Sequence, residues 1–166
     1  PIPVLESTAE ELDALRARED DVDANLIGEM VAGDPLMTLR VLAHAAANRP
    51  PRMLTDTGTV TAAVVMMGIS PFFRAFGPPP TVEDRLGAQP AALAGIRKVL
   101  RRSHRAATFA LAFAVHRMDP DAALIHQAAL LHDFAELLLC CHAPVLALEL
   151  RRVQLADPAL RSPNAQ

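Results

Sequence analysis

The sequence predicts an all-α fold, and three features point that way. Of the 166 residues 51% are hydrophobic but only 4% are aromatic, so the apolar content is mainly Ala, Leu, Val and Met, which are mostly good helix formers. Apolar residues recur at three- and four-residue spacing along most of the chain. No stretch alternates apolar and polar residues in the way that is typical of strands. The length suits one domain with a substantial core.

The N-terminal half is predicted to form a layer of short helices with clear start and stop signals. Ser7 followed by Glu10 has the spacing of a capping box at the start of the first helix. Gly33 ends the second helix, and Asp34-Pro35 supplies a cap and a first-turn proline for the third. The helices expected in this half cover residues 7–18, 22–33, 35–48 and 59–67, with a short one after Ser70.

A Gly-Pro-Pro-Pro sequence at residues 77–80 is the strongest interruption in the chain. We therefore expect an N-terminal helical layer over residues 1–77, a linker over 78–90 and a second helical part over 91–166. The helices expected after the break cover residues 90–118, as one helix or two in tandem, and then 122–132, 135–141 and 145–155.

Composition and charge narrow the class of protein. The formal net charge of -3 argues against bulk attraction to nucleic acid or an anionic membrane. No apolar run is expected to approach the length of a membrane span, and the first residues lack a basic leader region. Cys140 and Cys141 are neighbours and are poorly placed to bridge each other. We therefore expect a cytoplasmic protein that does not contact the membrane.

The adjacent His132 and Asp133 stand in an otherwise almost entirely apolar run, residues 128–139. An unpaired polar group in such surroundings costs about 1–3 kcal/mol, so each side chain needs a partner. His104 is the natural third member, because it shares a predicted helix face with Leu100 and Leu111. One interpretation is that His104, His132 and Asp133 bind a divalent metal ion that polarises a phosphate ester. The other is that they hydrogen-bond one another without a metal.

Several motifs resemble a known family. Residues 130–133 (Leu-Leu-His-Asp), together with His104, are similar to the HD superfamily of metal-dependent phosphohydrolases. Residues 33–36 (Gly-Asp-Pro-Leu), the Ala47-Asn48 helix end and the apolar stretch 62–68 narrow the resemblance to the HDOD domain, a bacterial signalling and regulatory output module. The resemblance covers nearly the whole chain and implies a multi-helix HD-like bundle. It also implies that the bundle is incomplete at its C-terminal end.

Two departures from active HD enzymes bear on activity. Those enzymes commonly carry glycine and lysine after the His–Asp step, where this chain has Ala135 and Glu136. A carboxylate in place of a phosphate-facing cation adds repulsion toward a phosphorylated substrate. The only later aspartate, Asp157, is not where the motif places a fourth metal ligand. The resemblance therefore implies a vestigial, non-catalytic site without a cofactor and a role through protein partners or self-association. A metal-dependent phosphohydrolase is the alternative.

A basic stripe runs along the predicted helix after the break: Arg97, Lys98, Arg101, Arg102 and Arg105. One interpretation is a phosphate or nucleic-acid contact through Arg97, Arg101 and Arg105. The other is a solvated helix face whose positive charge is balanced by acidic residues of the N-terminal helices. The absence of aromatic stacking platforms and of a net basic charge favours the second.

Overall fold

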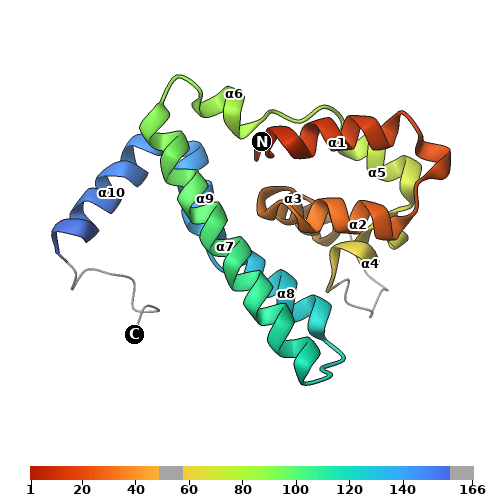
Figure 1. The fold of residues 1–166 in the computed structure, drawn as a ribbon. Helices are drawn as coiled ribbons and strands as arrows, with labels where there is room; N and C mark the ends of the chain where they lie inside the picture. The colour runs from red at the N-terminus through yellow and green to blue at the C-terminus, as the bar shows by residue number, and fades with distance from the viewer. Residues whose placement is uncertain (49–57, 158–166) are drawn as a thin grey trace.

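A computed structural model describes residues 1–48 and 58–157 of the chain. It is all-α, as predicted, and the described residues contain no strand beyond one isolated bridge between Val4 and Thr81. The elements in chain order (Figure 1) are α1 (Glu6–Arg16), a 3-10 turn η1 (Glu19–Asp21), α2 (Ala24–Ala32), α3 (Pro35–Ala47), α4 (Val60–Met67), α5 (Ile69–Ala75), α6 (Val82–Leu86), α7 (Pro90–His116), α8 (Ala122–Leu131), α9 (Phe134–His142) and α10 (Pro144–Ala156).

The first five helices pack around one apolar cluster. Each contributes a side chain that is completely buried, namely Leu12, Ile27, Val41, Val64 and Phe72. These residues come from the helical apolar spacing of each segment, which places one face inward. The cluster forms the core of the N-terminal layer.

The start of α1 differs from the prediction. The capping box is wrong, because α1 begins at Glu6 after Leu5 and no side chain caps it locally. Its first amide groups are bonded by acids from distant segments instead. The N–H of Leu5 donates to Asp34 Oδ2 at 2.8 Å, and the N–H of Glu6 donates to Glu83 Oε2 at 3.1 Å. Because tertiary contacts satisfy these donors, Ser7 has no capping role.

The second cluster lies between α6, α7 and α9. Residues 78–90, expected as a linker, contain α6, whose Val82 and Leu86 side chains are both 1% exposed. They pack with Ile96 of α7, and Leu36 of α3 joins the same cluster from the N-terminal layer. The 90–118 segment forms one continuous helix, α7.

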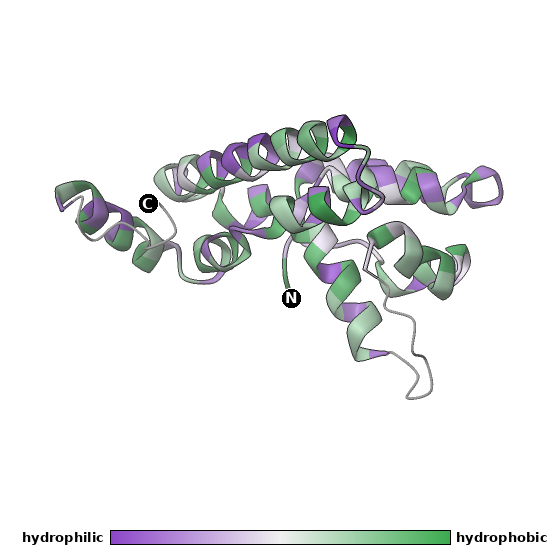
Figure 2. Ribbon diagram, turned by 90° about the horizontal axis from the view of Figure 1, so that it is seen from below, coloured by the Kyte–Doolittle hydropathy of each residue, from purple (hydrophilic) through white to green (hydrophobic). Residues whose placement is uncertain are grey.

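Helices α8 and α9 together form the stretch Ala122–His142. Among the described residues it alone is long and apolar enough, by length and composition, to span a membrane, so the expectation that no run approaches that length is wrong. In the structure the stretch is two helices, and Leu130 and Leu137 on them are buried in the protein. Figure 2 shows hydrophilic residues grouped along the middle of α7 and apolar residues toward its C-terminal end.

Candidate functional site

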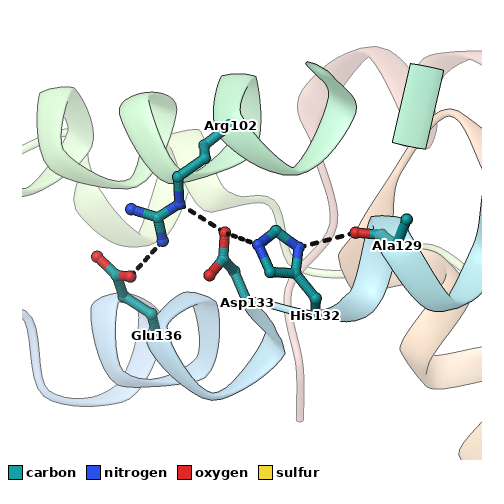
Figure 3. Close-up of polar contacts among 5 residues, drawn as sticks. All are labelled: Arg102, Ala129, His132, Asp133 and Glu136. Carbon is teal, nitrogen blue, oxygen red and sulfur yellow. Dashed lines mark hydrogen bonds and ion pairs between the residues drawn. The ribbon is translucent and has the colours of Figure 1, made fainter. Parts of the chain in front are cut away.

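The His132–Asp133 pair lies at the break between α8 and α9. His132 keeps right-handed helical angles, with φ of −59° and ψ of −27°, whereas Asp133 departs from them, with φ of −97° and ψ of 16°. The two polar residues interrupt a run of apolar ones, and the break places them opposite the middle of α7 (Figure 3). The Asp133 side chain is only 15% exposed, so its carboxylate needs partners in the protein.

Arg102 of α7 is the main partner of this carboxylate. Its Nε donates to Asp133 Oδ2 at 2.7 Å, and its Nη2 donates to the Glu136 carboxylate (Figure 3). The hydrogen bond to Asp133 is the largest cause that raises the pKa of Arg102, with partial burial opposing and Glu136 adding to it. One guanidinium therefore donates charge-assisted hydrogen bonds to two carboxylates that the site presents side by side.

His132 is oriented by two acceptors. Its Nε2 lies 3.1 Å from Asp133 Oδ2, and its Nδ1 lies 2.8 Å from the carbonyl oxygen of Ala129. A neutral imidazole has one N–H and donates to only one of these acceptors at a time. His132 and Asp133 thus contact each other.

His104 takes a different neighbour. It is half-buried on α7 and interacts electrostatically with His126 of α8, whose pKa is lowered mainly by burial and further by His104. From sequence alone His126 has no convergent partner. Among residues 1–48 and 58–157 no three or more His, Cys, Asp or Glu side chains form a group that could hold a metal ion.

The arrangement therefore does not fit a divalent ion. His104, His132 and Asp133 are not gathered as one ligand set, and Asp133 Oδ2 is already bonded to a guanidinium and an imidazole. Sequence reasoning placed Arg102 in the basic stripe and did not pair it with Asp133. The available signal is the i, i+3 spacing of Asp133 and Glu136, which puts two carboxylates on one side of the start of α9.

The rest of the basic stripe faces outward. Arg97 approaches Glu83 of α6 at 3.9 Å, while Lys98, Arg101 and Arg105 are exposed. Within the described part of the chain no ion pair joins the stripe to α1 or η1. The expectation that the acidic N-terminal helices balance the positive charge of the stripe is therefore wrong. The helices packed against α7 are α6, α8, α9 and α10. Three cations of the stripe therefore point into solvent.

The two cysteines of α9 belong to the second apolar cluster. Cys140 and Cys141 are free and buried. Burial raises the pKa of both thiols, that of Cys141 to about 12. A thiol rather than a thiolate is therefore present at neutral pH, and these residues pack as small apolar groups.

Comparison with known families agrees with the fold and with the motifs. A family model described as "HDOD domain" matches residues 2–161, nearly the whole chain. The chain belongs to the HDOD family. The resemblance drawn from the sequence is confirmed. No curated protein and no solved structure matches it. In this HDOD chain the His–Asp pair is bonded to an arginine of α7.

Proposed function

We propose that this HDOD chain is a non-catalytic regulatory module of bacterial signal transduction, located in the cytoplasm, that acts through protein partners or self-association. The observation that carries the proposal is the guanidinium of Arg102 between Asp133 and Glu136. An internal cation bonds the carboxylate that a metal-dependent enzyme would need as a ligand. Binding a divalent ion there would require displacing Arg102 from two charge-assisted hydrogen bonds.

The second carboxylate of the site adds to this reasoning. Glu136 lies where active relatives carry a lysine, and a negative charge there opposes the approach of a phosphate. Hydrolysis of a phosphate ester needs positive charge at the developing oxyanions. Among the described residues the cation bonded in this network is Arg102, and it already donates to two carboxylates.

Exposed apolar side chains support the role in protein contacts. Phe109 and Phe113 lie one turn apart on α7, and their exposed fractions are 71% and 65%. Aromatic side chains held on a rigid helix are typical anchors of protein–protein interfaces.

Metal content and hydrolysis test the proposal directly. We expect protein purified without chelator to hold no stoichiometric transition metal and not to hydrolyse bis(p-nitrophenyl) phosphate with added Mn²⁺. A bound metal with turnover that His132→Ala and Asp133→Ala both abolish would overturn the proposal. His116→Ala, which changes an exposed histidine of α7, is the matched control and should leave any such activity unchanged.

The two alternatives make different predictions. A phosphohydrolase that uses His104, His132 and Asp133 would also lose metal and turnover in His104→Ala. A nucleic-acid contact through Arg97, Arg101 and Arg105 would show an affinity that falls steeply with salt and is lost when Arg101→Glu and Arg105→Glu are combined.

A further inference from the structure

An open apolar groove lies on the hairpin of α7 and α8. The alanines Ala110 and Ala114 form its floor, between the two exposed phenylalanines and Ile125 of α8. Arg117 and Asp119 lie at one end of the groove, whose volume is about 640 Å³. A floor of small residues between larger walls lets another helix approach closely. The groove therefore has the form of a helix-binding site.

Helix α10 presents an apolar surface that is convex, in contrast to the α7–α8 groove. It has no buried residue, although its inner side packs on α7 and α9. Leu146 and Leu150 lie one turn apart on its outer side, with exposed fractions of 58% and 44%, beside the more exposed Val145. Glu149 and Arg152 pair with each other along the same helix. The outer side of α10 is thus a convex apolar stripe with one acid and one base at its edge.

The groove and the stripe lie far apart within one molecule. Figure 1 shows α10 beside the N-terminal end of α7 and the tip of the α7–α8 hairpin at the opposite end of α7. Because α10 is anchored on α7 and α9, it does not reach the groove of its own chain. The complement to each surface is therefore available on a second copy.

We propose that two copies of this chain associate by reciprocal exchange, with α10 of each copy seated in the α7–α8 groove of the other. This inference rests on the proposed role in self-association and names its surface. The contact pairs Leu146 and Leu150 with Phe109 and Phe113. In such a two-fold dimer the same pair of patches meets twice.

Area and charge both suit this occupant. Two phenyl rings and the aliphatic side chains of α10 with these exposures present on the order of 600 Å² at each contact, so two contacts reach roughly the 1,200 Å² of a small specific interface. Each surface also carries one acid and one base, Arg117 and Asp119 on the groove and Glu149 and Arg152 on α10. Matching these charges across the contact would exchange the Glu149–Arg152 pair within α10 for pairs with Asp119 and Arg117.

The mass of the intact protein in solution, measured by light scattering during gel filtration, tests this association. We expect a concentration-dependent dimer whose dissociation constant rises on the order of 30-fold or more in Phe113→Ser and in Leu150→Ser, because each removes a central apolar anchor. Val65→Ser changes an equally exposed apolar residue of α4 and should leave the dimer intact. Circular dichroism confirms that each variant is folded.

Mixing the two variants distinguishes exchange from other dimers. The Phe113→Ser chain keeps its α10 stripe, and the Leu150→Ser chain keeps its groove. A heterodimer of the two variants therefore has one intact contact, whereas each variant by itself has none. The heterodimer should have a lower dissociation constant than the homodimer of either variant. A dimer that is unaffected by Leu150→Ser, or a mixture no tighter than its components, would overturn the exchange.

Disulfide trapping gives an independent readout. Phe113→Cys mixed with Leu150→Cys under mild oxidation should yield a cross-linked heterodimer, whereas wild-type protein should not cross-link because Cys140 and Cys141 are buried. Failure to trap that pair in a protein that dimerises would also contradict the inference. If the wild-type protein stays monomeric and does not hydrolyse phosphoesters, the proposed dimer is overturned and the non-catalytic function is not. If the protein dimerises but shows metal-dependent turnover, the non-catalytic function is overturned and the dimer is not.

Discussion

The Nε of Arg102 lies 2.7 Å from Oδ2 of Asp133 and ties the middle of α7 to the break between α8 and α9. The same guanidinium reaches Glu136, so one cation holds two carboxylates from the start of α9. The arginine is 44% exposed while the Asp133 side chain is only 15% exposed. The bond is therefore partly shielded from water on the aspartate side, where an unpaired charge is most unfavourable.

Arg102→Met should lower the free energy of unfolding by about 1 kcal/mol, at the upper end of values for exposed ion pairs, because the Asp133 carboxylate loses its main cation. Urea unfolding at low salt measures the change. Arg101→Met, at an exposed neighbour on the same helix, should change stability by less than about half as much. The free energy of unfolding lost in Asp133→Asn should be smaller in the Arg102→Met background than in the wild type. An equal loss in both backgrounds would show that the two residues are not coupled and that the assigned bond is wrong.

Asp34 predicts a pH dependence of stability. This carboxylate is fully buried at the start of α3, and burial raises its pKa above the ordinary 3.8 despite hydrogen bonds from Leu5, Leu36 and Met37. The folded protein then holds the proton to higher pH than the unfolded chain does, so the contribution of Asp34 to stability is largest below its ordinary pKa and declines as pH rises through the folded pKa.

The comparison with Asp34→Asn isolates this effect, because the amide does not ionise. The unfolding free energy of the wild type minus that of Asp34→Asn should fall as the pH rises above the ordinary carboxyl pKa of 3.8. A difference that rises over this range would show that the folded pKa is lowered instead. Asp34→Ala, which also leaves the Leu5 amide without its acceptor, should cost about 2–4 kcal/mol near neutral pH.

Gln127 of α8 connects the hairpin to the N-terminal layer. Its Oε1 accepts from the Val60 N–H and its Nε2 donates to the Gly58 carbonyl, both at 2.8 Å. Gln127→Ala leaves two backbone groups unpaired at the start of α4 and should cost about 2 kcal/mol. Amide hydrogen exchange should speed up at Val60, and Gln154→Ala, at a half-buried glutamine of α10, should leave that amide protected. Unchanged exchange at Val60 in Gln127→Ala would refute the link.

Gly28 marks a close crossing of α2 and α4. A Cβ built on Gly28 would clash with Thr61 Oγ1 and lie 3.2 Å from Thr61 Cβ. Gly28→Ala should therefore destabilise the protein by about 1–3 kcal/mol, although alanine favours helices. Thermal unfolding measures the change. Gly95→Ala is the matched control: it adds the same methyl group to α7, where the nearest heavy atom would be Leu148 Cδ2 at 4.0 Å, and should be neutral or slightly stabilising. Equal losses in both variants would contradict the crowding at Gly28.

Local signals account for what the sequence predicted well. The third helix begins after Asp34 and the helix at residues 59–67 ends at Gly68, as expected, because caps, first-turn prolines and terminal glycines act within a few residues of where they stand. The HDOD assignment likewise rests on short motifs in a fixed order. These features need no knowledge of how the helices pack.

The sequence by itself determined the all-α fold, most helix boundaries and the family, because periodicity and stop signals are properties of neighbouring residues. Only the tertiary structure decided that Asp34 and Glu83 rather than Ser7 bond the amide groups leading into α1, that Arg102 rather than His104 contacts Asp133, and that His104 interacts electrostatically with His126. The physical reason is that a buried polar group must be satisfied but the partner can come from any segment that packing brings within about 3 Å, and spacing along the chain does not encode that choice.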